Sequence, residues 1–295
     1  MDIAITGSTG LIGTALSRHL TAEGHRVVPI TRSGTTGIHW DPAAGELDGA
    51  ALEGIDAVVH LAGEGIAEKR WTDEQKAKIL DSRVDGTTLL ARTLASLDRP
   101  PAVLLSGSAI GYYGDRGAAE LTETSPPGDD FLGGLVTAWE GATAEAEAAG
   151  IRVAHLRTGI VLSTEGGVLG KLLPLYKLGL GGKLGNGQQY MSWVSIDDEV
   201  GIITWLLGND VSGPVNLTGP EPVTNEEFTK ALGAQLGRPT FLTVPAFGPR
   251  ILLGGELAEA LLFSSARVLP AVAEANGYEF RHPTIAAAFA DILGR

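Results

Sequence analysis

The sequence contains no cysteine among its 295 residues. Disulfide bonds, thiolate zinc sites, iron–sulfur clusters and cysteine nucleophiles are therefore excluded. The six histidines are scattered and form no His-x-His or His-Glu-x-x-His pattern, so we expect no metal site. A Gly-x-Ser-x-Gly motif is also missing, which argues against the nucleophile of an α/β-hydrolase.

Basic residues are in deficit, with 22 Lys and Arg against 35 Asp and Glu and a net charge of −13. Such a surface repels phosphate backbones and anionic lipid headgroups, so we expect no nucleic-acid and no membrane-surface binding. No apolar run is long enough to span a bilayer, and the N-terminus enters a strand without a basic leader. These features predict a cytoplasmic protein, and they are compatible with a small-molecule substrate and with a homo-oligomer.

Short β-branched runs alternate with longer amphipathic stretches rich in Ala and Leu. Strands are predicted at Ile3–Ile5, Val27–Ile30, Ala57–Leu61, Val103–Leu105 and Val153–Leu156, and helices at about Leu11–Ala22, Glu74–Leu97 and Leu132–Ala148. Continuously apolar strands separated by helices indicate an α/β fold with a doubly wound parallel sheet of the Rossmann type. The stretch His39–Leu47 predicts a small hairpin inserted between the second and third strands.

After about residue 160 the pattern is less regular. Loops are predicted at Gly166-Gly167 and Gly179–Gly187, strands at Tyr190–Val194 and Val215–Leu217, helices from Asp197 and from Asn225, and short helices after Pro245. We therefore divide the chain into a Rossmann domain, residues 1–165, and a smaller C-terminal lobe for the substrate, residues 166–295. Some strands of the lobe are expected to return to the main sheet, and residues 245–295 form its short helical region.

A glycine-rich turn follows the first strand directly and opens the first helix. It reads Gly7-Ser8-Thr9-Gly10-Leu11-Ile12-Gly13, with the Gly-x-x-Gly-x-x-Gly spacing of a dinucleotide fingerprint. Gly7 permits the tight turn, Gly10 lets the backbone approach a pyrophosphate, and Gly13 allows the helix to pack closely on the strand. The helix N-terminus adds free N–H groups and a positive dipole end. We expect these seven residues to bind a dinucleotide; the alternative is a plain strand-to-helix turn.

The end of the second strand indicates which dinucleotide binds. An NAD site would place Asp or Glu there, to accept hydrogen bonds from the ribose 2′-hydroxyl. The residues present are Thr31, Arg32 and Ser33, and none of them is acidic. Arg32 could stack on the adenine and offer a fork to a 2′-phosphate, while Thr31 and Ser33 offer hydroxyls. These residues favour NADP(H) over NAD(H), with a solvated loop arginine as the alternative.

Further segments carry a resemblance to a known family. They are His60-Leu61-Ala62-Gly63, Arg70-Trp71-Thr72, Asp81-Ser82-Arg83, Ser108–Gly114, Asp130-Phe131-Leu132, Trp139-Glu140, Leu156–Ser163, Gly179–Gly182, Met191–Val194 and Gly213–Leu217. Together they resemble the atypical extended short-chain dehydrogenases/reductases, NAD(P)-dependent epimerase family proteins with a short helical C-terminal region. The resemblance covers nearly the whole chain.

The resemblance implies roles for residues at the ends of strands. The segment Leu61-Ala62-Gly63 would bind the adenosine side of the cofactor, in part through its backbone. Arg83 would reach the pyrophosphate or the nicotinamide ribose, with a helix-surface salt bridge as an equal alternative. Arg157 would follow the strand beside the nicotinamide. Ser106 and Ser108 end the fourth strand, the usual place of the catalytic serine, and Ser108 is the preferred candidate.

One expected motif is missing. Short-chain dehydrogenases move the proton through Tyr-x-x-x-Lys, yet the stretch Phe131–Trp139 contains neither residue. Tyr112 or Tyr113 could replace the acid, with packing of the loop as the alternative. The sequence therefore predicts an NADP(H)-binding oxidoreductase or epimerase-like enzyme with a non-standard acid. The alternative function is an NADP(H)-binding sensor or regulatory protein without turnover. The loop Gly179–Gly187, with Gln188, Gln189 and Trp193, is expected to border the substrate cleft, with a flexible surface connection as the alternative.

Overall fold

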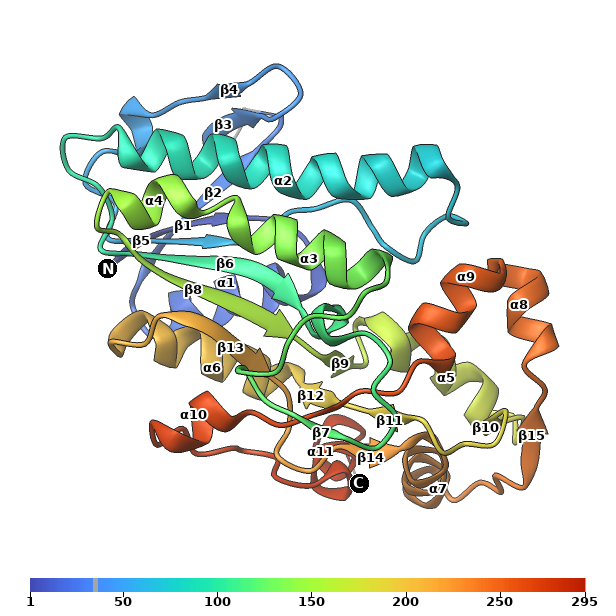
Figure 1. The fold of residues 1–295 in the computed structure, drawn as a ribbon. Helices are drawn as coiled ribbons and strands as arrows, with labels where there is room; N and C mark the ends of the chain where they lie inside the picture. The colour runs from blue at the N-terminus through green and yellow to red at the C-terminus, as the bar shows by residue number, and fades with distance from the viewer. Residues whose placement is uncertain (34–36, 295) are drawn as a thin grey trace.

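The structure is a computed structural model that describes residues 1–33 and 37–294. A sheet in the order β13-β8-β6-β5-β1-β2-β3-β4 forms its centre (Figure 1). The strands are β1 (Asp2–Thr6), β2 (Arg26–Thr31), β3 (Ile38–Asp41), β4 (Glu46–Leu47), β5 (Ala57–His60), β6 (Val103–Ala109), β8 (Arg152–Thr158) and β13 (Gly213–Leu217). All neighbours pair in parallel except β3 and β4. The predicted doubly wound α/β fold is confirmed.

Helices cover both faces of this sheet (Figure 1). One face carries α1 (Leu11–Ala22) and α6 (Ile196–Gly208), and the other carries α2 (Asp73–Ala95), α3 (Phe131–Gly141) and α4 (Ala144–Ala148). Within β1, Ile3 and Ile5 belong to the core under α1 and α6, whereas Ala4 belongs to the core under α2 and α4. Side chains alternate between faces along a strand, so a sheet buried on both sides needs apolar residues at every position. This explains the continuous apolar runs in the sequence.

Two predictions in the N-terminal half meet different outcomes. The hairpin predicted at His39–Leu47 is present as the antiparallel pair β3–β4, which extends the sheet beyond β2. The single helix predicted at Leu132–Ala148 is wrong, because it is divided into α3 and α4. At the division the Thr143 hydroxyl donates to the backbone carbonyl of Glu140 at 2.8 Å. Thr and Gly are weak helix formers, and a local side-chain bond of this kind competes with the helix.

The rest of the chain builds small two-stranded sheets around a separate core. Its strands are β7 (Glu120–Leu121), β9 (Ile160–Ser163), β10 (Gly182–Leu184), β11 (Tyr190–Met191), β12 (Trp193–Ser195), β14 (Val223–Thr224), β15 (Leu242–Val244) and β16 (Arg267–Val268). Its helices are α5 (Gly167–Lys177), α7 (Asn225–Leu236), α8 (Phe247–Leu253), α9 (Gly255–Ala258), α10 (Ala271–Ala275) and α11 (Ile285–Ile292), with a π-helical turn η3 (Glu259–Phe263). Short 3₁₀ turns η1 (Ala50–Leu52) and η2 (Ile110–Tyr113) lie earlier in the chain. Trp193, Phe228 and Phe289 are buried in this second core.

The predicted loops in this region are only partly loops. Helix α5 begins at Gly167, and its Leu169, Leu173 and Tyr176 are buried at helical spacing. Strand β10 lies inside the stretch Gly179–Gly187 and pairs with β15. The sequence did not predict these elements, because their glycines and Pro174 are residues that usually end helices and strands. Strand β13 joins the main sheet beside β8, as the sequence predicted for part of this region.

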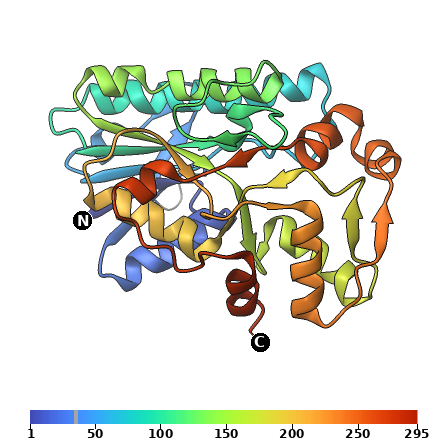
Figure 2. The same ribbon diagram turned by 60° about the horizontal axis from the view of Figure 1, so that its bottom comes forward.

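The C-terminal segment runs beside α6 (Figure 2), and Asp198 of α6 holds it there. This buried carboxylate accepts backbone N–H groups of Arg281 at 2.8 Å and His282 at 3.0 Å, and the Ser195 hydroxyl at 2.9 Å. Arg281 and His282, more than 80 residues after Asp198 in the chain, are thereby held against α6. Among the helices of the described residues, none is long and apolar enough to cross a bilayer.

Candidate functional site

The carboxyl ends of β1, β5, β6 and β8 meet at one cavity of about 550 Å³. The glycine turn after β1 lines it, together with Leu61, residues 107–109 and residues 158–161. The chain leaves β1 toward β2 on one side of the sheet, while β5 lies on the other side. This divergence is the topological switch point where open α/β sheets bind ligands. The cavity is therefore the candidate functional site.

The three glycines of the turn have different surroundings. Gly7 has a φ of +66°, and a Cβ there would lie 2.9 Å from the Leu61 backbone carbonyl carbon. A Cβ on Gly13 would lie 2.2 Å from the Gly7 carbonyl oxygen. At Gly10 the nearest atom, the Gly7 oxygen, is 3.3 Å away. The fold thus requires Gly7 and Gly13, whereas Gly10 leaves its backbone open toward the cavity. The intervening Ser8, Thr9, Leu11 and Ile12 complete the turn, and Leu11 and Ile12 also line the cavity.

The residues predicted to select the dinucleotide lie at the end of β2, which pairs with β1. Thr31 is half-buried, and Arg32 and Ser33 are exposed. The Thr31 and Ser33 hydroxyls lie 3.5 Å apart. Pairing of Thr6 with Ile30 brings this end of β2 beside the glycine turn. The three side chains are therefore placed along the same edge of the sheet as the cavity.

The backbone after β5 is held by the Thr6 hydroxyl. Its oxygen accepts the N–H groups of Leu61 at 3.0 Å and Ala62 at 3.1 Å, so its own proton goes to His60 Nδ1 at 2.7 Å. His60 Nε2 then donates to the Thr87 hydroxyl at 3.0 Å. Burial, and then the nearby Arg83, lower the pKa of His60 to about 4, so its ring is neutral near pH 7. Because these two amides already have a partner, only other atoms of Leu61 and Ala62 can contact a cofactor.

Arg83 lines the cavity from α2. Its Nη1 donates to the Glu64 carbonyl at 3.0 Å, and its guanidinium lies 5.0 Å from the Trp139 ring. It forms no ion pair with any described residue, so the helix-surface salt bridge is not the arrangement present. Burial lowers the pKa of Arg83 to about 10, while Glu64 opposes this shift. Arg83 is a cation at neutral pH, and Gly63 lies against its side chain.

The two predicted serines of β6 point to different places. Ser108 lines the cavity, and its hydroxyl donates to Glu140 Oε1 at 2.6 Å. Ser106 is fully buried and paired in register with His60, and its hydroxyl has no hydrogen-bond partner in the described chain. The geometry therefore brings only Ser108 to the cavity.

Glu140 and Arg157 form a buried pair behind Ser108. Arg157 Nε and Nη2 donate to the two Glu140 oxygens, both at 2.8 Å. Burial raises the pKa of Glu140, but the hydrogen bonds from Arg157 and Ser108 lower it more. Burial alone would lower the pKa of Arg157, but its hydrogen bonds to Glu140 raise the pKa by more, so the net shift is upward. Both groups are charged at neutral pH. Sequence reasoning gave Glu140 no role, because a single helical Glu usually faces water.

The two predicted tyrosines lie behind this pair. Tyr113 is fully buried, accepts from Arg157 Nη1 at 3.0 Å and donates to Asn216 Oδ1 at 2.7 Å. Burial raises the pKa of Tyr113 to about 12, while Arg157 opposes the shift. The ring of Tyr112 lies 3.5 Å from the Arg157 guanidinium carbon. Neither tyrosine is among the described residues that line the cavity, so a direct acid role for them stays a prediction.

Helix α3 presents apolar side chains where a Tyr-x-x-x-Lys pair would face the cavity. That motif has the i, i+4 spacing of one helix face. The residues of α3 at this spacing that line the cavity are Leu132 and Val136. Trp139 lines it as well, and its Nε1 donates to the Thr87 hydroxyl at 3.0 Å. The wall is thus apolar and can supply no proton.

A second hydroxyl in the cavity is backed by a buried acid that sequence reasoning missed. Thr158 lines the cavity and bonds Glu199 Oε1 at 2.8 Å. Glu199 is fully buried on α6, and its Oε2 has no hydrogen-bond partner among the described residues. Burial raises the pKa of Glu199 to about 8, and the Thr158 hydrogen bond only partly opposes it. The side chain is therefore predominantly a neutral carboxylic acid at pH 7.

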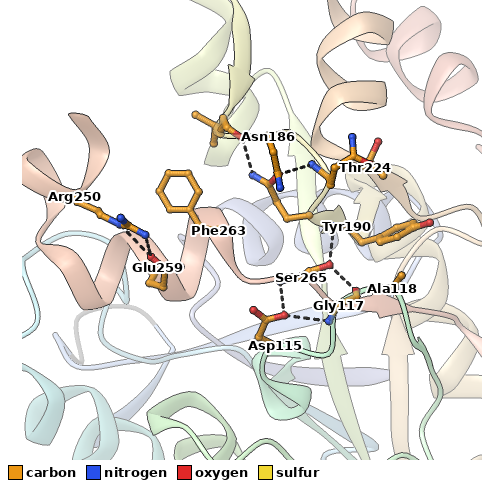
Figure 3. Close-up of a pocket in the computed structure, with 13 residues that line it drawn as sticks. Asp115, Gly117, Ala118, Asn186, Tyr190, Thr224, Arg250, Glu259, Phe263 and Ser265 are labelled. Atoms are coloured by element: carbon orange, nitrogen blue, oxygen red, sulfur yellow. Dashed lines mark hydrogen bonds and ion pairs between the residues drawn. The ribbon is translucent and has the colours of Figure 1, made fainter. Parts of the chain in front are cut away.

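A second cavity of about 630 Å³ adjoins the first, and Tyr190 lines both (Figure 3). Residues 259–266 run between them: Ala260, Leu261, Ser264 and Ala266 line the first, and Glu259, Phe263 and Ser265 line the second. The Ser265 hydroxyl donates to the Gly117 carbonyl at 2.6 Å and accepts from Tyr190 N at 3.0 Å. Gln188 and Gln189 line this second cavity. Leu184 and Asn186 of the predicted loop line it as well, whereas Trp193 is buried in the second core. That this cavity receives a substrate stays a prediction.

Two family models match the chain. The model of the NAD dependent epimerase/dehydratase family covers residues 3–218. A domain of unknown function (DUF1731) covers residues 244–292, the part that holds α8 to α11.

Several known proteins are similar over nearly the whole chain. An epimerase family protein of Mycobacterium tuberculosis is 44% identical over 287 residues, 96% of this chain and 94% of that protein. Human epimerase family protein SDR39U1 is 37% identical over 298 residues, 99% of this chain and 100% of the human protein. The solved structure of human SDR39U1 (isoform 2) with NADPH has a TM-score of 0.92 and 35% identity, and covers 100% of this chain and 99% of that one. A nucleoside-diphosphate sugar epimerase from Corynebacterium glutamicum has a TM-score of 0.82 and 39% identity, covering 100% of this chain and 58% of that one.

Proposed function

This chain belongs to the NAD dependent epimerase/dehydratase family, and we propose that it is an NADPH-dependent oxidoreductase of the extended short-chain dehydrogenase/reductase type, acting on a small molecule. The observation that carries the proposal is the cavity at the switch point. It joins the glycine turn to the hydroxyls of Ser108 and Thr158, so a dinucleotide and groups that exchange protons share one space.

The residues at the sheet edge fit NADPH. The N-terminus of α1 offers free N–H groups to a pyrophosphate, and Gly10 leaves the backbone open to it. The exposed Arg32 beside Thr31 and Ser33 suits a 2′-phosphate, and no acid stands there to bind a 2′-hydroxyl. The similar human protein has been solved with NADPH, which supports the same choice here. When bound, this cofactor supplies a hydride.

Reduction of a carbonyl also needs a proton, and we assign it to Thr158. In the structure the Thr158 hydroxyl donates to Glu199 Oε1, and Glu199 holds a proton at neutral pH. For the transfer this hydrogen bond reverses: Thr158 turns its hydroxyl hydrogen to the substrate oxygen and accepts the Glu199 proton at Oγ1 as its own proton leaves. Oxidation of an alcohol reverses both transfers. Ser108 donates to Glu140, which is ionised and therefore has no proton to pass on. The role of Ser108 is to orient the substrate oxygen. Tyr113 acts through Arg157 and is a positioning residue.

The test is NADPH oxidation across a panel of aldehydes and ketones, with Thr158→Val and Ser108→Ala as variants. Loss of a general acid costs about 10²–10⁴-fold in rate, and we expect a loss in this range for Thr158→Val. Thr93→Val is the matched control, since that hydroxyl only bonds the Leu89 carbonyl of its own helix. Turnover that neither variant changes would place the active site elsewhere. Tight NADPH binding without turnover on any compound would overturn the oxidoreductase proposal and leave a binding protein.

A further inference from the structure

Exposed apolar side chains gather at one end of the molecule. Nine large hydrophobic side chains are exposed in the described chain, and all but Met1 lie in three neighbouring segments. They are Leu175, Leu178 and Leu180 at the end of α5, Phe241 and Leu242 on and just before β15, and Phe247, Ile251 and Leu252 on α8. Phe241 is 81% exposed and Leu252 is 74% exposed. We call these eight residues the α5–α8 face.

The three segments are close in space as well as alike in composition. Strand β10, which follows α5, pairs with β15 so that Gly182 faces Leu242. Strand β15 then leads within a few residues into α8. In both views α5, β10, β15 and α8 occupy the same end of the molecule (Figures 1 and 2). Apolar patches of this kind on a soluble protein mark interaction sites.

The charge of this end differs from that of the rest of the chain. Residues 166–196 and 228–255, which hold the whole α5–α8 face, contain six Lys or Arg and no Asp or Glu. All 35 acidic residues therefore lie elsewhere. The net charge of −13 is therefore unevenly distributed along the sequence, although Glu226 and Glu259, just outside these ranges, pair with three of the six cations.

Three of these six cations form no ion pair with a described residue and could bind an external anion. Lys183 and Lys230 pair with Glu226, and Arg250 pairs with Glu259. The other three are Lys171, Lys177 and Arg238; all are exposed, and none forms an ion pair with a described residue. The α5–α8 face is thus an apolar surface accompanied by unpaired positive charge.

We propose that the α5–α8 face docks on an anionic phospholipid bilayer. Phe, Leu and Ile side chains flanked by Lys and Arg are the composition by which peripheral segments insert into the headgroup region. Lys171, Lys177 and Arg238, which form no ion pair with a described residue, would be attracted to the anionic headgroups. The overall net charge predicted no membrane-surface binding, whereas the distribution of the charge provides a site for it.

Two other occupants fit the face less well. A second copy of this chain, bound face to face, would bring Lys171, Lys177 and Arg238 against the same cations of its partner. A protein partner usually meets a patch depleted in Lys and enriched in Tyr and Trp. Here two of the three free cations are Lys, and none of the exposed apolar residues is Tyr or Trp.

Docking would also place the cavity close to the lipid. Helix α8 continues through α9 into η3, and Ala260 and Leu261 of η3 line the first cavity. Arg70 Nε and Nη2 donate to the Leu252 carbonyl at 3.2 and 3.1 Å, fixing the end of α8 to the loop before α2. The proposed lipid contact and the cavity wall therefore belong to one continuous segment.

Flotation of the full-length protein with vesicles tests the proposal. One set of vesicles is phosphatidylcholine alone, and the other mixes it with an equal part of phosphatidylglycerol. We expect the wild type to float with the phosphatidylglycerol vesicles and not with phosphatidylcholine alone, and to be released by added salt because salt screens the cations. Failure to bind phosphatidylglycerol vesicles at low salt would overturn the proposal.

Variants assign the binding to the face. Lys177→Glu and Arg238→Glu should each weaken binding at least about five-fold, the change equivalent to about 1 kcal/mol for one lost cation. Phe247→Ser with Ile251→Ser should abolish flotation. Arg99→Glu is the matched control, an exposed Arg at the far end of α2 whose reversal changes the net charge equally. An unchanged melting temperature and NADPH affinity would establish that each variant is folded.

Three outcomes would count against a lipid surface. Binding that Lys177→Glu and Phe247→Ser with Ile251→Ser leave unchanged would place the contact elsewhere. Equal loss in Arg99→Glu would mean that total charge, and not this face, governs binding. Self-association abolished by the Phe247 and Ile251 changes, without vesicle binding in the wild type, would assign the face to a second copy.

Discussion

The three glycines of the turn after β1 meet different neighbours, although the sequence motif treats them alike. Gly7 and Gly13 are in contact with backbone, whereas Gly10 faces the cavity. The motif predicted the tight turn at Gly7 and the close packing at Gly13, because both depend mainly on local chain geometry, while the pyrophosphate contact of Gly10 stays a prediction. It could not predict which backbone atoms the turn would contact, since Leu61 is more than fifty residues away in the chain.

This difference predicts opposite effects for two substitutions. Gly10→Val should abolish NADPH binding and leave the melting temperature nearly unchanged, because its side chain fills the space for the pyrophosphate. Gly13→Ala should lower the melting temperature, because its methyl group would lie 2.2 Å from the Gly7 oxygen. Calorimetric titration with NADPH and thermal unfolding measure the two effects. Normal NADPH binding by folded Gly10→Val would show that the phosphate turn lies elsewhere.

The second prediction at the scale of single residues concerns the part of Arg32 in the preference for NADPH over NADH. If it binds the 2′-phosphate through a charged hydrogen bond of about 1.5–3 kcal/mol, Arg32→Ala should weaken NADPH binding roughly ten- to a hundredfold. NADH binding should change little, so the preference for NADPH should disappear. Fluorescence titration with both cofactors measures this, with Arg99→Ala as the control away from the sheet edge. Equal affinity of the wild type for NADPH and NADH would refute the assignment.

Glu199 predicts a pH-dependent contribution to stability. Its pKa rises from 4.5 to about 8 on folding, so the native state keeps a proton that the unfolded chain releases. This contribution is full below pH 4.5 and is lost as the pH rises through about 8, at up to about 1.4 kcal/mol per pH unit. Relative to Glu199→Gln, the wild type should therefore lose unfolding free energy across this range. Denaturant unfolding at several pH values tests it, with the exposed Glu274→Gln as control; parallel curves for the wild type and Glu199→Gln would contradict it.

Among the elements, α3 departs most from what the family pattern leads one to expect. Its cavity face carries Leu132 and Val136, and its last turn carries Glu140, which pairs with Arg157 of β8. The missing Tyr and Lys could be read directly from the sequence. The role of Glu140 could not, because its partners come from β6 and β8 and meet it only in the folded sheet. Similarly, Glu199 follows two Asp in the first turn of α6 and reads as a solvated acid.

The Glu140–Arg157 pair predicts how firmly α3 is held to the sheet. Glu140→Gln would leave the Arg157 cation, which is only 3% exposed, without its partner, and should cost about 3–5 kcal/mol of unfolding free energy. The exposed pair Arg92–Glu145 is the control, and Glu145→Gln should cost no more than about 1 kcal/mol. Guanidinium unfolding measures both. Equal costs would mean that the buried pair does not clamp the helix.

For the whole molecule, alternation of strands and helices was enough to predict the central sheet, because both of its faces are covered by local βαβ units. The small sheets of the C-terminal part were harder, since β10 and β15 pair across almost sixty residues. Net charge was the least informative property, because it does not show that residues 166–196 and 228–255, which hold the α5–α8 face, contain no acidic residue. Features that depend on contacts distant in sequence were therefore the ones that sequence alone could not supply.

The central claim is that the glycine turn holds NADPH in the same cavity as the hydroxyls of Ser108 and Thr158, where a hydride supplied by the cofactor would reach the substrate. Its most direct test uses NADPH labelled with deuterium at the nicotinamide C4 and mass spectrometry of the product of any compound that turns over. The account predicts one deuterium on the former carbonyl carbon, formed far more slowly by Thr158→Val and not at all by Gly10→Val. A product without deuterium, or a labelled product formed equally well by Gly10→Val, would contradict it.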